Sequence, residues 1–360
     1  MKAPLRSIAV FSPYLPREGR KRGGVDRVAH DLADGLARRG HRVVVWSHDP
    51  QPPRAAYSVR PLPWGEFCDT WLGLRLTSGY LNNFLAVLPR YGDVEVIIAH
   101  GDSLLLPFRG RPLIRVMHGS ARAEARTATS ALRYVAQSGV FVQELLTGLT
   151  QRGCVGVSEN TLRDNPFVKR VIPNGVDLSI FSGDGAGKSA EPSIAFVGTL
   201  TGRKRGALLM EWFAAQVRPR HPTARLWMVG PPGPPAEGVE YFSGISPADL
   251  AQLYRRAWVY ASPSSYEGFG LPYVEAMASG TPVVATPNPG SREVTAEGRF
   301  GLLVEDAEFA VTVTRLLGDA EERRRWIELG RTRAQEFSLD RMLDRYEQLM
   351  NELCGPSRTG

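Results

Sequence analysis

The first 46 residues carry the hydrophobic pattern of a strand, a helix and a second strand. Apolar residues fill most of Ser7–Phe11. Between Val25 and Leu36 they recur every three or four positions, which is the spacing of one helix face, and Gly40 is placed to end that helix. A second apolar run occupies Arg42–Trp46. This order predicts a βαβ unit, and hence a parallel sheet with a right-handed crossover.

The alternation of strand-like and helix-like segments continues through two halves of the chain. In the first half it predicts strands at Val94–Ala99, Leu113–Met117, Cys154–Val157 and Lys169–Ile172, and helices over 122–137 and 139–150. In the second half it predicts strands at Ser193–Val197, Ala224–Val229, Trp258–Ala261 and Val283–Ala285, and helices at Ala207–Ala215, Pro247–Ala257, Pro272–Ser279, 320–335 and 339–353. We expect an α/β fold with two doubly wound, Rossmann-like domains facing each other across a cleft.

A Gly/Ser-rich segment, residues 182–192, separates the two series. We therefore predict a first domain over 1–175, a flexible linker over 176–192 and a second domain over 193–338. The segment contains Gly187-Lys188-Ser189, but Ser182 stands where a phosphate-binding P-loop requires a glycine. It is interpreted as a linker and not as a nucleotide-binding loop.

Composition excludes several classes of protein. Of the 360 residues, 43% are hydrophobic and 22% are charged, which is typical of a globular chain and not of a disordered or coiled-coil one. The three cysteines, Cys68, Cys154 and Cys354, lie far apart, so no disulfide scaffold or zinc knuckle is expected. No apolar run is long enough to cross a membrane, and the N-terminus lacks a signal-peptide core. We expect a cytoplasmic protein.

The formal net charge of +7 is concentrated near the N-terminus. Residues 1–60 hold 12 Lys/Arg and 5 Asp/Glu, whereas the other 300 residues hold 32 of each sign. A nucleic-acid-binding module would spread its positive charge more widely. We therefore expect no nucleic-acid partner, although such a module is kept as the least favoured alternative.

The strongest candidate chemistry lies between residues 262 and 286. Pro272 is expected at the first position of a helix, so that Phe269, Gly270 and Leu271 form the turn before its N-terminus, where free backbone amides favour an anion. Glu275, one turn inside the helix, has the acceptor atoms to bind a vicinal diol such as a ribose. Glu267 on the loop is placed to reach the hydroxyls of a bound sugar.

These residues carry a resemblance to a known family. The stretch from Glu267 to Ala285, E-G-F-G-L-P-Y-V-E-A-M-A-S-G-T-P-V-V-A, resembles the E-x7-E signature of retaining glycosyltransferase family 4 (group 1), which has the GT-B fold. Other motifs of that family follow in its order: Gly23-Gly24, Met117-His118-Gly119, Ile172–Asp177, and Val197–Leu200 with Arg203-Lys204. The resemblance covers nearly the whole chain, and it implies that the last helix, 339–353, packs back on the first domain.

The resemblance also implies roles for individual residues. Arg203 and Lys204 would neutralise the diphosphate of a nucleotide-sugar donor, Glu275 would hold its ribose and Glu267 its sugar. The remaining donor contacts would come from the amides of Phe269, Gly270 and Leu271, from Gly23 and Gly24 beside the phosphates, and from Phe242, Gly244 and Ile245 in the loop that receives the base. His118 would lie near the anomeric carbon and touch the transferred sugar.

The expected activity is that of a retaining hexosyltransferase. It would move a sugar from a UDP- or GDP-linked donor to an acceptor hydroxyl, in the biosynthesis of a glycan, a glycolipid or a glycosylated metabolite. No protein nucleophile is assigned. Since the chain has no D-x-D motif and no His/Asp cluster, we expect no catalytic metal and no cofactor. A nucleotide-sugar epimerase or a phosphorylase on the same fold is the alternative.

Two departures from the family pattern affect single positions. Thr199 stands where many members have arginine, so the positive charge is assigned to Arg203 and Lys204 instead. Ser279 replaces a common cysteine, which we interpret as a change in packing.

Acceptor choice is expected to lie in the first domain. The basic loop Arg17–Arg22, densest at Arg20, Lys21 and Arg22, would stand beside an aromatic segment, Trp64–Phe84. A cationic rim next to apolar surface suits an anionic acceptor, either lipid-linked at the inner face of a membrane or small and soluble. The simpler interpretation, a solvated loop and core aromatics, is equally compatible with the sequence.

Overall fold

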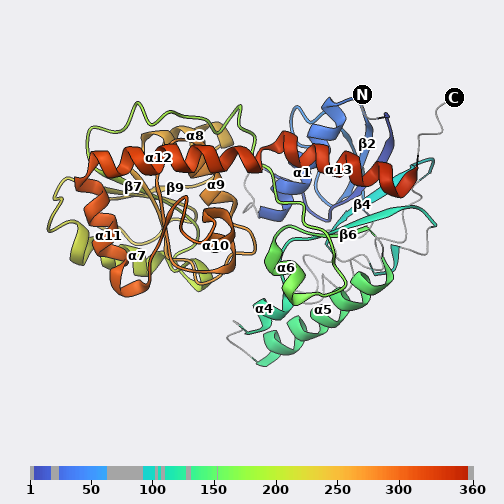
Figure 1. Ribbon diagram of the computed structural model, residues 1–360, viewed down its shortest axis with the longest axis horizontal. Helices are drawn as coiled ribbons and strands as arrows, with labels where there is room; N and C mark the ends of the chain where they lie inside the picture. The colour runs from blue at the N-terminus through green and yellow to red at the C-terminus, as the bar shows by residue number, and fades with distance from the viewer. Residues whose placement is uncertain are drawn as a thin grey trace. The chain divides into compact units, whose positions relative to one another are not determined.

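The computed structural model divides into two compact units (Figure 1). It describes residues 4–17, 24–62, 92–101, 104–106, 110–126, 131–151 and 153–355. One unit comprises Met1–Asn174 with Leu339–Gly360, and the other Gly175–Ser338. Residues 176–192, expected as a linker, therefore belong to the second unit.

The first unit is built on a parallel sheet of six strands in the order β3-β2-β1-β4-β5-β6. Its strands are β1 (Ser7–Phe11), β2 (Arg42–Ser47), β3 (Ser58–Pro61), β4 (Val96–His100), β5 (Leu113–Met117) and β6 (Gly153–Gly156). β4 and β5 are buried along their whole length, and they are accordingly apolar except for the buried His100 and Arg115. The predicted strand at Lys169–Ile172 is wrong: that segment makes only one bridge, from Val171 to Gly156.

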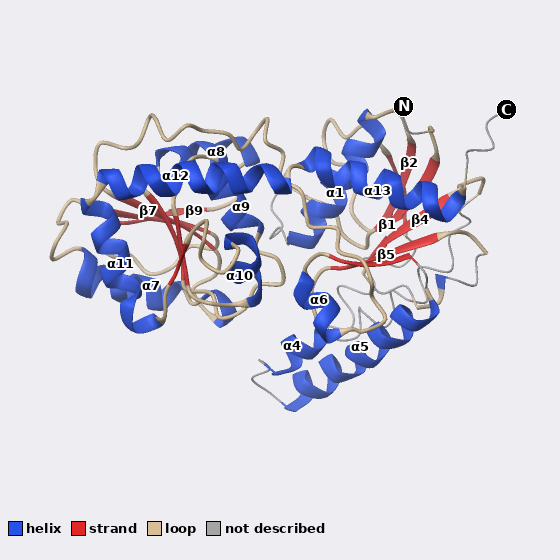
Figure 2. Ribbon diagram, viewed as in Figure 1, coloured by secondary structure: helices blue, strands red, loops and turns tan. Residues whose placement is uncertain are grey.

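Helices cover this sheet (Figure 2). They are α1 (Gly24–Arg38), α4 (Ala121–Arg126), α5 (Ala131–Thr150), α6 (Glu159–Asp164) and α13 (Leu339–Cys354). The expected helix boundary near residue 138 is wrong, since α5 continues through Ser138 and Gly139. Tertiary packing and the helix formers around Gly139 outweigh the roughly 1 kcal/mol cost of one internal glycine.

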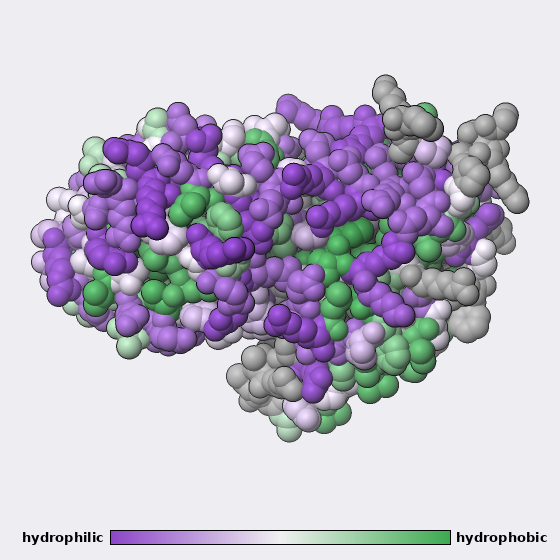
Figure 3. Space-filling view, in the orientation of Figure 1, coloured by the Kyte–Doolittle hydropathy of each residue, from purple (hydrophilic) through white to green (hydrophobic). Residues whose placement is uncertain are grey.

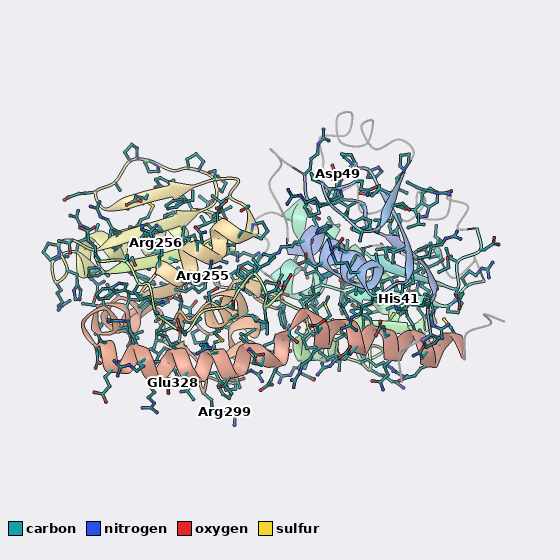
Figure 4. The ribbon with its side chains drawn as sticks, turned by 90° about the horizontal axis from the view of Figure 1, so that it is seen from above. His41, Asp49, Arg255, Arg256, Arg299 and Glu328 are labelled. Atoms are coloured by element: carbon teal, nitrogen blue, oxygen red, sulfur yellow. The ribbon has the colours of Figure 1, made fainter. Side chains whose placement is uncertain are left out.

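The last helix packs against the first one. Arg39, just after α1, forms ion pairs with Asp340, Asp344 and Glu347 of α13. His41 lies alongside α13 (Figure 4) and its Nε2 is 3.0 Å from Glu347 Oε1. The apolar side of α13, which includes Leu343 and Tyr346, is buried.

The second unit contains another parallel six-stranded sheet, in the order β12-β11-β10-β7-β8-β9. Its strands are β7 (Ser193–Val197), β8 (Arg225–Val229), β9 (Val239–Phe242), β10 (Val259–Ser262), β11 (Val283–Ala285) and β12 (Leu302–Leu303). Its α-helices are α7 (Gly206–Trp212), α8 (Pro247–Arg256), α9 (Leu271–Ala278), α10 (Pro289–Thr295), α11 (Asp306–Gly318) and α12 (Ala320–Ala334). The predicted pair of doubly wound α/β domains is confirmed.

Residues 182–192 are fixed to the second unit by hydrogen bonds. Lys188 Nζ donates to the carbonyl oxygens of Ala257 and Gly280, each at 2.7 Å. Arg255, at the C-terminal end of α8 (Figure 4), donates to the carbonyls of Ile180 and Ser182. The segment is thus a packed strap, because its lysine satisfies carbonyls that the ends of α8 and α9 leave unpaired.

Each sheet reverses its strand order once, between β1 and β4 in the first unit and between β7 and β10 in the second. In open parallel sheets, ligands bind at the carboxyl edge where this reversal separates two loops. The loops after these four strands are therefore the places where a site is expected.

Candidate functional site

In the second unit, the loops after β7 and β10 are joined by backbone contacts. The β7 loop carries a short 3-10 turn, Gly202–Lys204, and Ser265 N of the β10 loop donates to the Arg203 carbonyl at 2.8 Å. The reversal point of this sheet therefore brings Arg203 and Lys204 close to Glu267.

Glu267 lies between the two cations. Arg203 Nη1 is 2.6 Å from its Oε2 and Lys204 Nζ is 2.5 Å from its Oε1. The residue is 5% exposed. Burial acts to raise the pKa of this carboxyl, but the charges and hydrogen bonds of Lys204 and Arg203 outweigh it and hold the pKa below its ordinary value. The result is a cationic site with one fixed carboxylate, suited to an anionic ligand.

The expected turn before α9 is present with a shift of one residue. The helix begins at Leu271, so Pro272 is its second residue and not its first. Gly270 precedes it with φ +93°, and a Cβ there would lie 2.4 Å from the Tyr273 ring, so only glycine fits. The side chain of Phe269 is buried edge-on against Phe337. Phe269 therefore offers a ligand its backbone and not its ring.

Glu275 is buried within α9, with only 2% of the residue exposed. Its Oε2 accepts a hydrogen bond from Tyr254 Oη at 3.3 Å. The tyrosine is fully buried as well, so the contact holds one carboxylate oxygen in place. The predicted role of Glu275 toward a ribose stays a prediction.

The loop assigned to the base follows β9, whose last residue is Phe242. Gly230 N donates to the Phe242 carbonyl, and Ser243 Oγ donates to the Gly230 carbonyl. Gly244, with φ +65°, and Ile245 then lead to Ser246, the N-cap of α8. The loops after β8 and β9 are thus neighbours at the same carboxyl edge as the cations.

Two positioning contacts were missed from the sequence. Gly290 N, in the first turn of α10, donates to the Glu267 carbonyl at 3.0 Å, and a Cβ on Gly290 would lie 2.5 Å from the Phe269 carbonyl oxygen. Arg205, with φ +51°, makes a two-pronged ion pair with Asp306 and donates from Nε to the Pro263 carbonyl. The sequence Asn-Pro-Gly at 288–290 is typical of a helix start and could have predicted α10. No local sequence pattern indicates that Arg205 pairs with Asp306.

In the first unit, the predicted residues again lie at the carboxyl edge of the sheet. Gly24 is the first residue of α1, and among the described residues no atom outside its chain neighbours and its own helix backbone lies within 4 Å of a Cβ placed on it. His118 directly follows β5, is half-buried, and its Nε2 is 2.8 Å from His100 Nδ1. Burial, aided by the nearby Arg115 charge, lowers the pKa of His118 to about 3. Its partner His100 was not predicted.

Several sequence predictions fall outside the described residues. These are Gly23, the cationic run Arg20–Arg22 and the aromatic segment Trp64–Phe84. Within the part of the chain that is described, no group of three His, Cys, Asp or Glu is arranged to hold a metal ion. No helix there combines the length and the apolar character needed to cross a membrane.

Comparison with known proteins identifies two family models along the chain. The model for Glycosyltransferase Family 4 matches residues 22–180, and that for Glycosyl transferases group 1 matches residues 191–319. One curated relative is a D-inositol 3-phosphate glycosyltransferase from Nocardia farcinica, 35% identical over 43% of this chain and 41% of its own length. Another is an MMP alpha-(1->4)-mannosyltransferase from Mycolicibacterium hassiacum, 31% identical over 63% and 55%. The chain thus spans about half the length of these relatives.

Solved structures share the fold over almost the entire chain. Sucrose-phosphate synthase from Thermosynechococcus elongatus has a TM-score of 0.79 at 23% identity, covering 97% of this chain and 99% of that one. WaaG, a glycosyltransferase involved in lipopolysaccharide biosynthesis, has a TM-score of 0.72 at 16% identity, covering 97% and 100%. Anabaena Alr3699/HepE in complex with UDP and glucose has a TM-score of 0.71 at 17% identity, covering 97% and 100%.

Proposed function

The chain belongs to the family 4 (group 1) glycosyltransferases with the GT-B fold, and on this basis we propose that it transfers a sugar from a nucleoside-diphosphate donor to an acceptor hydroxyl with retention of configuration. The observation that carries the proposal is the pair Arg203 and Lys204, held by Glu267 at the strand-order reversal of the second sheet. A departing diphosphate gains negative charge as the glycosidic bond breaks, and fixed cations stabilise that charge in the transition state.

The neighbouring residues complete a donor site. The backbone amides of Gly270, the N-cap of α9, and of Leu271, its first residue, would add partial positive charge for the phosphates. Glu275, fixed by Tyr254, would accept from the two ribose hydroxyls. The loop from Phe242 to Ile245 would receive the base, which is uracil or guanine. Uracil is supported by the likeness to HepE in complex with UDP and glucose.

Two predicted side chains, Glu267 and His118, are proposed to contact the transferred sugar. Glu267 would accept from its hydroxyls with the oxygen lone pairs that the two cations leave available. His118, whose depressed pKa keeps it uncharged at neutral pH, would contact the sugar as a neutral imidazole. The acceptor hydroxyl would attack on the face from which the diphosphate leaves, and the leaving phosphate would take its proton. No metal or cofactor enters this scheme.

Nucleotide binding is tested by thermal shift with UDP and GDP. A nucleotide present at 100 times its Kd stabilises the protein by about 2.7 kcal/mol. Glu275→Ala should lose about 1.5–3 kcal/mol of binding free energy, since a charged acceptor is removed from the ribose. Lys204→Ala should also bind more weakly, whereas Lys169→Ala, an exposed lysine of the first unit, should bind as the wild type does. Unchanged binding by both site variants would contradict the assignment.

The acceptor is proposed to be anionic and lipid-linked at a membrane surface. Helix α5 turns apolar side chains outward (Figure 3), with Val135, Val142, Leu146 and Leu149 each 45–66% exposed. Phe167, 40% exposed, lies against Gly148 of the same helix. Helix α4, which packs on α5, carries the exposed Arg122, and α6, whose C-cap Asn165 donates to the Glu144 carbonyl of α5, carries the exposed Arg163. An apolar helix face flanked by cations suits the interface of an anionic bilayer.

Sedimentation with vesicles tests whether the protein binds a membrane surface, as a lipid-linked acceptor requires and a soluble acceptor does not. The wild type should sediment with phosphatidylglycerol vesicles at low salt, and Leu146→Ser with Leu149→Ser should shift it to the supernatant. A matched variant, Val311→Ser on an exposed position of α11, should sediment normally. If the wild type stays in the supernatant, the acceptor is better sought among small anionic molecules.

A further inference from the structure

Two histidines meet at the carboxyl edge of the first sheet, where the neighbouring strands β4 and β5 end. His100 is the last residue of β4, and its register partner on β5 is Val116, two residues before His118. Because both strands run parallel, the two imidazoles leave the sheet at the same carboxyl edge. Their ring planes are inclined by only 25° with centroids 5.1 Å apart, and His100 Nδ1 lies 2.8 Å from His118 Nε2.

Both imidazoles are uncharged at neutral pH. Burial lowers the pKa of His100 well below its ordinary value, and the pKa is lowered further by repulsion from Arg115 and from any positive charge on His118. Burial and Arg115 likewise depress the pKa of His118. A neutral imidazole has one N–H donor and one bare nitrogen. The short contact therefore holds a single proton, donated either by His100 or by His118.

The other nitrogen of His100 decides between these two arrangements. His100 Nε2 is fully buried and has no hydrogen-bond partner among the described residues. If His118 were the donor, His100 would carry its proton on Nε2, and that N–H would be buried without an acceptor. Unpaired buried N–H groups are rarer than unpaired acceptors. The arrangement in which His100 Nδ1–H donates to His118 Nε2 is therefore favoured, and it leaves the proton of His118 on Nδ1.

We propose that His100 is a positioning residue, which orients His118 and holds it in the Nδ1–H tautomer. His118 then presents an N–H donor, and not a bare nitrogen, to an oxygen of the transferred sugar. This inference rests on the proposed contact between His118 and the sugar, but the tautomer itself is a property of the free protein. Catalysis would gain because a donor that is already oriented needs no reorganisation when charge develops.

The tautomer is tested on the full chain by long-range proton–nitrogen NMR with ¹⁵N-labelled histidine. His118→Asn and His100→Asn variants assign the signals. We expect His118 to show a protonated Nδ1 and a bare Nε2, and His100 to show the same pattern. A spectrum in which His118 carries its proton on Nε2 would overturn the proposal, whatever the enzyme's activity.

Substitutions at position 100 test the consequence for transfer. In His100→Asn the amide N–H can occupy the place of Nδ1–H, so kcat should stay within about threefold of the wild type. In His100→Leu no donor remains, and in His100→Gln the amide is displaced toward the position of Nε2. For these two, kcat should fall by about tenfold or more, with the donor KM nearly unchanged because the nucleotide binds to the second unit.

Further measurements distinguish a failure of the positioning role of His100 from a failure of the proposed function of His118. The control is His221→Leu. His221 lies in the second unit, where its Nε2 contacts the Thr314 carbonyl, so this variant shows the general effect of removing an imidazole. Equal losses in His100→Asn and His100→Leu, with folding intact by circular dichroism, would reject the positioning role. If His118→Ala itself transfers sugar normally, the proposed function of His118 fails, and the NMR result still decides the tautomer.

Discussion

Glu267 shows how one residue can serve both structure and chemistry. The sequence assigned the carboxylate to a sugar and the cations to a diphosphate, as separate roles. In the fold, the carboxylate pairs with Arg203 and Lys204 and is nearly inaccessible to solvent. It keeps two like charges side by side, which would otherwise repel each other. Its removal should therefore affect both the order of the loop and the reaction.

The conservative variant Glu267→Gln should separate these contributions. Gln keeps the shape but not the charge, so we expect turnover to fall by about 100-fold and the free energy of unfolding to fall by about 1.5–3 kcal/mol at pH 7. The stability difference should depend on pH. The folded-state pKa of Glu267 lies below its unfolded value of about 4.3, so its contribution is complete above that value and disappears as the pH falls through the folded pKa.

Urea denaturation of both proteins between pH 3 and 8 measures this difference. Arg225, whose ion pair with Glu191 is exposed on both sides, offers the matched control: Glu191→Gln should change stability by less than about 1 kcal/mol. A constant difference between the wild type and Glu267→Gln across the whole range would contradict the ion-pair explanation.

At the scale of elements, the site depends on a helix that does not contribute a predicted ligand contact. The first turn of α10 holds the Glu267 carbonyl through Gly290 N and packs directly against the Phe269 carbonyl. The N-cap Asn288, which accepts from Ser291 N, fixes where this helix begins. Helix α10 thus fixes the loop after β10, which carries Glu267 between Arg203 and Lys204.

Gly290→Ala should displace that loop. The added methyl would lie 2.5 Å from a backbone oxygen, so we expect a loss of about 1–3 kcal/mol in stability together with weaker nucleotide binding by calorimetry. For Gly318→Ala, in α11, the nearest atom among the described residues outside its own helix is His221 Cε1 at 3.8 Å, so this variant should bind nucleotide normally. Equal behaviour of the two alanine variants would show that α10 does not position the loop.

A second prediction at this scale concerns the contribution of the strap, residues 182–192, to the stability of the second unit. Lys188→Met keeps the length of the side chain but leaves the carbonyls of Ala257 and Gly280 without their donor. We expect a loss of about 1–3 kcal/mol in the free energy of unfolding, measured by urea denaturation. Lys169→Met on the surface of the first unit should be neutral. A neutral Lys188→Met would mean that the strap contributes little to the second unit.

At the scale of the whole molecule, the chain leaves the first unit near residue 174 and returns to it near residue 339. The returning helix α13 supplies part of the first unit's core, including Leu343, Tyr346 and Met350. The first unit is therefore complete only when the second has been synthesised.

Tyr346→Ala should report on this dependence. The ring is 1% exposed, and its deletion should cost about 3–5 kcal/mol by leaving a cavity. Hydrogen exchange should then increase in β1, α1 and the other elements of the first unit more than in β7 to β12. Uniform acceleration in both units would instead indicate that they unfold as one.

The sequence by itself determined the fold class, because buried parallel strands are continuous apolar runs and helices repeat at 3.6 residues. It also determined where α8 begins, since Ser246 is the N-cap, in a capping box with Asp249, and Pro247 is the first helical residue. The E-x7-E stretch predicted the region of the proposed donor site. The local sequence pattern predicted a helix boundary near residue 138, inside α5, and a strand at Lys169–Ile172. Both predictions are wrong, because tertiary packing outweighs local preference there.

Only the tertiary structure decided how distant residues are paired. Glu267 and Arg203 are 64 positions apart, Arg205 and Asp306 are 101 apart, and His100 and His118 are 18 apart. The proximity of the Glu267–Arg203 and His100–His118 pairs follows from strand order: β10 pairs with β7, and β5 pairs with β4. Hydrophobic periodicity records whether a strand is buried and not which strand lies beside it. The contacts that fix charge and tautomer at the site therefore depend on the fold of the whole sheet.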